Sequence, residues 1–294
     1  MKIIDAHMHY YAVEGFDEVA RAAGHENSAA CWREICRKNG IAFAVAMGNT
    51  MDAPSRFGGV PPRLIDLSAP FDEQGWNQPQ DMGCCLGVMS EEINRENAEK
   101  TAQEFEYYLK SPHFLGIKLY PGYNAVYVND RRHWPLFELA RAYDVPVVIH
   151  TGDTARSGGL LKYSHPLTAD EAAVSFPDVT FVLAHCGNPW IVDAAEVAAK
   201  NPNVCLDLSG LLAGCPKRLL LYEDNAGYLQ HLRTWLNYLG QYDKVMYGSD
   251  WPLVNIPEYI RFIGHIVPER FHEQVFYHSA LRIFKRIAVL LPQR

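Results

Sequence analysis

The sequence predicts an α/β protein in which eight parallel strands close into a (β/α)8 barrel. Eight short runs of apolar and β-branched residues recur along the 294 residues, with helix-like segments between them. The runs lack the polar–apolar alternation of half-exposed strands, so we expect both faces of the sheet to be covered. Eight such units in one chain of this length favour a closed barrel over an open doubly wound sheet.

The elements follow one another in the order that a barrel requires. The predicted strands cover residues 3–5, 42–47, 84–89, 115–119, 146–149, 180–184, 204–208 and 245–247. Helical periodicity or composition is clearest over residues 90–110, 131–144, 189–200 and 225–240, and residues 271–291 are expected to form a terminal helix that covers the barrel. Ser90 is suited to cap the first of these helices. No linker or repeat is evident, so residues 1–294 are predicted to form a single domain.

One connection is much longer than the others. Residues 48–83, between the second and third predicted strands, are rich in Gly, Pro, Asp, Gln and aromatic residues. A long loop at the mouth of a barrel often serves as a lid or a specificity element. A surface excursion or a subunit contact explains this composition equally well.

The composition limits the partners that the protein is expected to have. A formal net charge of −7 makes the overall field a poor attractor of nucleic acid or of an anionic membrane surface. No apolar run approaches ~18 residues, and the first residues lack the pattern of a secretory signal. The seven cysteines are scattered, without the spacing of a zinc ribbon or a disulfide framework. We therefore expect a cytoplasmic protein with reduced thiols that acts on small molecules.

Polar residues with metal-ligating side chains stand at the ends of several predicted strands. His7 and His9 are two residues apart, so their side chains can point to the same side of a strand. His150, His185 and Asp250 each follow a later apolar run and precede a loop, which is where barrels build their active sites. Neutral imidazoles and a carboxylate suit Zn²⁺ and related divalent ions. The pattern therefore predicts a metal-dependent site at one end of the barrel.

Almost the whole chain then resembles the amidohydrolase superfamily, in particular the amidohydrolase-2 group that contains metal-dependent hydrolases and relatives of aminocarboxymuconate semialdehyde decarboxylase. The motifs that carry the resemblance occur in family order: "DAHMH", "GIKLYP", "VVIHTG", "FVLAHCGNPW", "NVCLDLSG", "YGSDWP" and "FYHSALRIF". The resemblance implies that His7, His9, His150 and Asp250 hold one divalent ion, with zinc expected first and manganese or cobalt as alternatives. It also implies that His185 is an acid/base or substrate-orienting group and that Asp250 accepts a proton.

Lys118 raises a separate question, because some members of the wider superfamily carry a carboxylated lysine at this position that bridges two metal ions. We favour an unmodified amine that contacts the substrate or a neighbouring carboxylate. Tyr120 stands where the family often has histidine. Further substrate contacts are expected from the long loop, from the segment after His150 and from the residue after Asp250, namely Arg56, Arg63, Trp76, Arg156, Lys162 and Trp251.

The expected reaction is hydrolysis of a small carboxylate-bearing amide, cyclic amide or lactone by metal-activated water. Asp250 would accept the proton of the water, and His185 would stabilise or protonate the developing oxyanion or the leaving group. The nearest alternative is a non-oxidative decarboxylase or a hydratase-like lyase that acts on an aromatic or muconate-like acid. A third possibility is a barrel that binds a metal ion or a ligand without catalysing a reaction. The resemblance and the apolar outer helices are also compatible with a homodimer.

Overall fold

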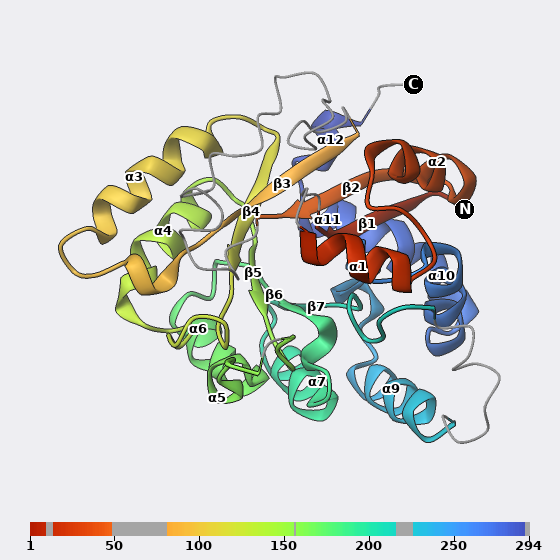
Figure 1. Ribbon diagram of the computed structural model, residues 1–294. Helices are drawn as coiled ribbons and strands as arrows, with labels where there is room; N and C mark the ends of the chain where they lie inside the picture. Colours follow the sequence, from red (N-terminus) through yellow and green to blue (C-terminus); the bar gives the residue numbers. More distant parts are fainter. Residues whose placement is uncertain (10–13, 49–80, 156, 216–225, 292–294) are drawn as a thin grey trace.

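Eight parallel strands form the centre of the protein in a computed structural model that describes residues 1–9, 14–48, 81–155, 157–215 and 226–291 (Figure 1). The strands pair in sequence order from β1 to β8. The last strand returns to the first, because Ala6 N donates to Tyr247 O at 3.0 Å and Met8 forms a bridge with Trp251. This pairing closes the predicted (β/α)8 barrel.

Each of the eight predicted runs overlaps one observed strand. The strands are β1 (Ile3–Met8), β2 (Ile41–Met47), β3 (Met82–Gly87), β4 (Phe114–Leu119), β5 (Val147–His150), β6 (Phe181–Ala184), β7 (Val204–Asp207) and β8 (Val245–Met246). The long connection between β2 and β3 is present, although residues 49–80 lie outside the described residues. Its predicted role as a lid or contact surface stays a prediction.

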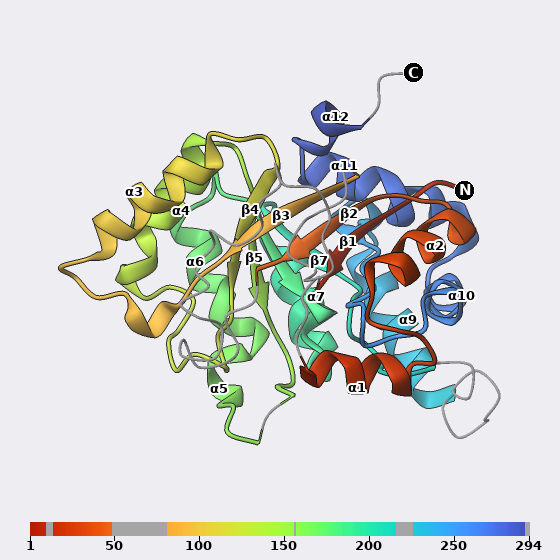
Figure 2. The same cartoon turned by 45° about the horizontal axis from the view of Figure 1, so that its top comes forward.

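Helices surround the strands, with α3 and α4 on one flank and α2 and α10 on the opposite flank in both views (Figures 1 and 2). Their bounds are α1 (Glu14–Ala22), α2 (Ala29–Asn39), α3 (Ala98–Leu109), α4 (Trp134–Ala142), α5 (Leu161–Ser164), α6 (Asp170–Ser175), α7 (Ile191–Lys200), α9 (Ala226–Leu239), α10 (Ile256–Ile266), α11 (Ser279–Ile283) and α12 (Ile287–Leu290). None of the helices in the described part of the chain has the length and apolarity needed to cross a membrane.

The expected cap of the helix after β3 is wrong. Ser90 begins a short 3-10 turn instead, and α3 begins only at Ala98. The Asn94 side chain accepts the backbone N–H groups of Glu96 at 2.9 Å and of Asn97 at 3.1 Å, which stabilises a turn where the helix was expected. The Ser90 hydroxyl lies 2.9 Å from His133 Nε2 and so joins two loops rather than capping a helix.

The C-terminal segment closes the end of the barrel opposite the proposed site. Ala280, Ile283, Phe284 and Ile287 are buried in one cluster with residues such as Val148 from the strands. The covering role predicted for residues 271–291 is therefore confirmed, but the segment is not one helix. Its chain leaves the helical conformation at Phe284, which has φ −94° and ψ 70° and a ring that is 1% exposed. Helix α11 therefore ends where the Phe284 ring is buried in the core.

Candidate metal centre

Three of the predicted metal ligands converge at the carboxyl ends of β1 and β8. The ligand-capable atoms of His7, His9 and Asp250 all lie within 4.8 Å of one another. Asp250 Oδ1 is 3.2 Å from His9 Nε2 and 3.6 Å from His7 Nε2. All three side chains are buried. Residues that are far apart in the sequence therefore form one compact cluster of two imidazoles and a carboxylate.

The backbone of β1 holds the turn that carries Asp250. His7 O accepts the N–H groups of Ser249 at 3.1 Å and of Asp250 at 2.8 Å. Asp5 Oδ1 accepts the N–H of Ser249 at 2.8 Å and that of His7 at 3.3 Å. Asp250 has a φ of +65°, which is an uncommon conformation for a residue with a side chain. These bonds hold it there, so the carboxylate is fixed relative to the two histidines.

Asp207, at the end of β7, was not predicted as a site residue, yet it organises the cluster. Its Oδ2 lies 2.8 Å from His7 Nδ1. Its Oδ1 accepts the N–H of Ser209 at 2.9 Å, the N–H of His185 at 3.2 Å and the Ser209 hydroxyl. Because the carboxylate can only accept, His7 must donate from Nδ1. The lone pair of His7 Nε2 therefore faces Asp250 and is available to a cation.

Asp207 also fixes His185 through Ser209. His185 Nδ1 lies 3.2 Å from Ser209 O and 3.0 Å from Ser209 Oγ. The Ser209 hydroxyl donates to Asp207, so its oxygen and the carbonyl are both acceptors for His185 Nδ1–H. The Nε2 lone pair of His185 is therefore the one left for chemistry. Its ring centroid lies 4.9 Å from that of His7.

The electrostatics favour the neutral form of His7 and His185 and the charged form of Asp250. Burial and the nearby Lys118 ammonium lower the pKa of His7 to about 4. Burial likewise lowers the pKa of His185. Burial alone would raise the pKa of Asp250, but the adjacent His185 and His9 hold it well below its usual value. At neutral pH His7 and Asp250 therefore offer an unprotonated nitrogen and a charged oxygen, which is the state that binds metal ions.

The donor set fits a divalent transition metal. His7 Nε2 and Asp250 Oδ1 are both buried and have no hydrogen-bond partner among the described residues. Leaving such atoms unsatisfied costs free energy unless a ligand satisfies them. Two imidazole nitrogens and one carboxylate oxygen match the ligands that zinc and its neighbours prefer, with open positions for water or substrate.

His150, the fourth predicted ligand, lies beside the cluster rather than within it. Its Nε2 is 2.9 Å from the carbonyl oxygen of Asp153. Its ring centroid lies 4.9 Å from that of His185. Burial and the neighbouring His185 lower the pKa of His150 well below its usual value, so the imidazole is neutral. Its role as a metal ligand stays a prediction.

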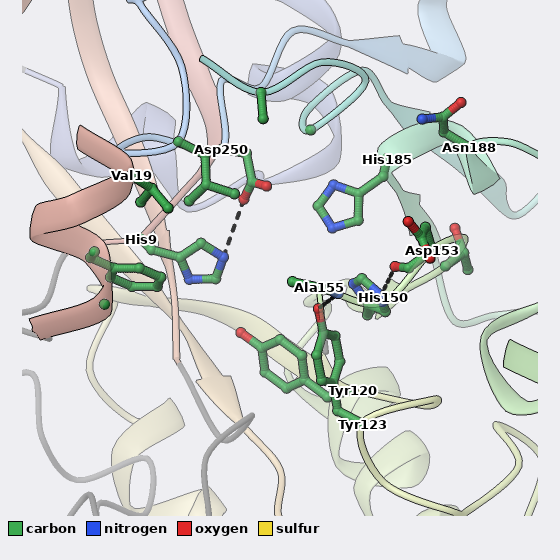
Figure 3. A pocket seen from close by; sticks show the side chains of 16 residues that line it. His9, Val19, Tyr120, Tyr123, His150, Asp153, Ala155, His185, Asn188 and Asp250 are labelled. Carbon is green, nitrogen blue, oxygen red and sulfur yellow. Dashed lines mark hydrogen bonds and ion pairs between the residues drawn. The ribbon is translucent and has the colours of Figure 1, made fainter. Parts of the chain in front are cut away.

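A cavity of about 440 Å³ opens in front of the cluster (Figure 3). His9, His150, His185 and Asp250 form its polar wall. Phe16 of α1 and the rings of Tyr120 and Tyr123 form an aromatic wall, as the close view shows for the two tyrosines. A small, partly apolar molecule can therefore approach both the candidate metal ligands and His185.

Lys118 and Tyr120 differ in their relation to this cavity, and the substrate contact expected of each stays a prediction. Tyr120 lines it directly. Lys118 is fully buried, and its Nζ has no hydrogen-bond partner among the described residues and lies 5.0 Å from the centre of the Tyr120 ring. Burial lowers the pKa of Lys118 to about 8, while Asp207 and Asp250 oppose the change.

The remaining predicted substrate contacts are not at the cavity or cannot be placed. Trp251 is buried behind Asp250 and packs on Trp32 and His25, with ring centroids 5.1 Å and 5.8 Å away. Lys162 is exposed on α5, with its Nζ 4.8 Å from the centre of the Tyr163 ring. The other four predicted contacts lie outside the described residues: Arg56, Arg63, Trp76 and Arg156.

Comparison with known proteins gives a family match over much of the chain. The amidohydrolase-2 model, described as amidohydrolase, matches residues 92–286, which is more than half of the chain. The chain belongs to the amidohydrolase family. This member of the family is therefore an enzyme of the amidohydrolase superfamily, as the order of its motifs implied. No curated protein gives a significant match.

Solved structures share the fold of this amidohydrolase-family chain at low sequence identity. A dihydroxybenzoic acid decarboxylase from Polaromonas sp. JS666, with bound manganese and 2-nitroresorcinol, is 17% identical with a TM-score of 0.66, covering 97% of both chains. A 5-carboxyvanillate decarboxylase from Sphingomonas paucimobilis is 15% identical with a TM-score of 0.64, covering 97% of this chain and 99% of the other. An amidohydrolase from Burkholderia multivorans with bound zinc is 16% identical with a TM-score of 0.63, covering 99% of this chain and 100% of the other.

Asp207→Asn tests the organising carboxylate. The substitution keeps the size of the side chain but removes the charge, and its amide nitrogen can only donate. We expect zinc affinity to fall about 10- to 100-fold, as for other partners of metal-ligating histidines. Competition with a chromophoric chelator measures the dissociation constant. Asp243→Asn is the matched control, because that carboxylate is largely exposed beside Arg282. Equal zinc affinity in a folded Asp207→Asn protein would show that Asp207 does not set the site.

Gly210→Ala tests the close approach between β7 and the cluster. Gly210 has a φ of +59°, and a Cβ there would lie 2.6 Å from His185 Nδ1 and 2.9 Å from Asp250 Oδ2. The methyl group must displace one of these side chains, so we expect zinc affinity to fall about tenfold or more. Gly227→Ala is the control, because its Cβ meets nothing within 4 Å and alanine favours the helix. A Gly210→Ala protein that binds zinc as the parent does would contradict the geometry.

Proposed function

We propose that the protein is a metal-dependent hydrolase of a small carboxylate-bearing amide, cyclic amide or lactone. The observation that carries this proposal is the double orientation of Asp250. Its Oδ1 faces His7 and His9, whereas its Oδ2 lies toward Gly210, beside His185. One carboxylate can therefore contribute one oxygen to the candidate metal cluster while its other oxygen stays near the His185 ring.

A single divalent ion is the cofactor that this site supports. His7, His9 and Asp250 would hold it, with His150 as the fourth ligand that the family resemblance implies. When bound, such an ion polarises a carbonyl group and makes a neighbouring water more acidic. The donor set favours zinc, and solved structures that share the fold carry manganese or zinc.

The residues around the ion divide the proton transfers of hydrolysis between them. The oxygen of a cavity water bonds to the substrate carbonyl carbon, and Asp250 Oδ2 accepts the proton that the water loses. His185 donates from Nδ1 to Ser209, so its Nε2 is the atom that can take up this proton and pass it on. The carbon–nitrogen or carbon–oxygen bond breaks as the leaving atom receives the proton. The low pKa of both groups keeps them in the accepting state at neutral pH.

Non-oxidative decarboxylation is the second candidate. Two of the fold neighbours are decarboxylases of aromatic acids, and they share the barrel over nearly the whole chain. In that reaction the bond between the carboxylate and a substrate carbon would break, and carbon dioxide would leave. A proton taken from a cavity water or from the substrate would pass through His185 or Asp250 to that carbon. The buried Lys118 would then lie close to a bound anion. The same residues can serve hydrolysis and decarboxylation, so only the reaction products distinguish the two reactions.

A substrate panel tests the proposal. The zinc- and manganese-loaded protein is assayed with lactones, amides and carboxylated aromatic or muconate-like acids, with ring opening and carbon dioxide as separate readouts. We expect metal-dependent hydrolysis of a lactone or amide, and a loss of about 10²-fold or more in His185→Gln, because removing a positioned proton carrier costs that much.

Control variants assign the turnover to this site. His278→Gln changes a largely exposed histidine and should leave the rate unchanged. Carbon dioxide release without hydrolysis would replace the hydrolase with a lyase. The absence of any turnover by the metal-loaded protein would favour a catalytically silent barrel.

A further inference from the structure

Tyr123 presents a rigidly held hydroxyl group to the cavity. Its ring meets that of His150 edge-on, with centroids 4.8 Å apart, and that of Tyr120 at 6.2 Å. Its oxygen accepts the backbone N–H of Ala155 at 2.8 Å. The tyrosine thus joins the loop after β4 to the loop after β5, and all four residues line the cavity (Figure 3).

The hydroxyl proton of Tyr123 is available to donate a hydrogen bond to another partner. A phenol oxygen that accepts an N–H still carries one hydrogen to donate. Among the described residues, the bond from Ala155 is the only hydrogen bond that the hydroxyl makes. A tyrosine phenol keeps its proton at neutral pH, because its usual pKa is about 10. Because Tyr123 lines the cavity, this proton is available to a molecule bound there.

The Tyr123 hydroxyl and the candidate metal ligands lie on different sides of the cavity. Figure 3 shows Tyr123 below His150 and on the other side of the cavity from Asp250 and His9. A substrate seated between them would meet the candidate metal ligands on one side and the tyrosine hydroxyl on the other. The N–H of Ala155 fixes the phenol oxygen beforehand, and a donor held in place stabilises developing charge better than a mobile one.

We propose that the Tyr123 hydroxyl donates a hydrogen bond to an oxygen of the bound substrate, either a carboxylate oxygen or the carbonyl oxygen that gains charge during the reaction. The assignment rests on the proposed function, since it places this donor in the same site. It makes Tyr123 a substrate-contacting residue. The sequence motif "GIKLYP" singled out Tyr120 as a substrate contact and gave no indication of Tyr123. A purely structural hydroxyl would instead serve only to bind Ala155.

Tyr123→Phe separates these two roles. The variant keeps the ring against His150 and removes only the oxygen. Tyr163→Phe is the matched control, because Tyr163 is also half-buried but packs on Tyr127 with ring centroids 4.5 Å apart and does not line the cavity. Metal content and thermal melting are measured first. Binding of benzoate and of phenylphosphonate to the zinc-loaded proteins is then measured by calorimetry, so the test does not need turnover.

We expect Tyr123→Phe to bind at least one of the two anions about tenfold more weakly, at unchanged metal content and melting temperature. With any substrate that the parent converts, kcat/KM should fall about 10- to 100-fold, which is the range for loss of one aimed donor. Anion affinities and kcat/KM equal to those of the parent would overturn the proposal. Failure of the parent to bind either anion at 10 mM, on the order of the weakest binding that such a donor would give, would also overturn it. A parent that binds anions without any turnover would overturn the proposed function alone.

Discussion

The buried carboxylate of Asp207 is the constraint on which the rest of the site depends. A charged group fully removed from water is costly unless donors surround it, and Asp207 receives donors from His7, His185 and both polar groups of Ser209. Satisfying this one charge fixes the proton on Nδ1 of His7 and, through Ser209, on Nδ1 of His185. Both Nε2 lone pairs are thereby directed away from the carboxylate, one toward the candidate metal position and the other into the cavity.

The barrel makes this arrangement possible because it brings the ends of distant strands together. β1 supplies His7, β6 leads into His185, β7 ends in Asp207, and the turn after β8 supplies Asp250. His185 and Asp250 both have positive φ values, of 62° and 65°. Such conformations are typical of functional sites and persist only where surrounding bonds hold them. The hydrogen bonds at the strand ends therefore hold His185 and Asp250 in these uncommon backbone conformations.

The strands and the candidate metal ligands could be predicted because each depends on local sequence. Unbroken apolar runs predict buried parallel strands, and a histidine or aspartate directly after such a run predicts a side chain at the barrel mouth. Asp207 gives the same signal at the end of the seventh run, but the resemblance assigned it no role, and only its contacts show one. Tyr123 could not be predicted, because its place depends on how two loops meet. The cap expected at Ser90 failed because asparagine side chains stabilise a turn first.

The central claim is that His7, His9 and Asp250 hold one ion in the orientation that Asp207 imposes. Anomalous diffraction at the zinc edge from crystals of the zinc-loaded protein tests it most directly. The account predicts a single strong peak at about 2.0–2.2 Å from His7 Nε2, His9 Nε2 and an oxygen of Asp250. The same map would show whether His150 turns from Asp153 to become the fourth ligand. A peak elsewhere, or a second ion bridged by a carboxylated Lys118, would contradict the account.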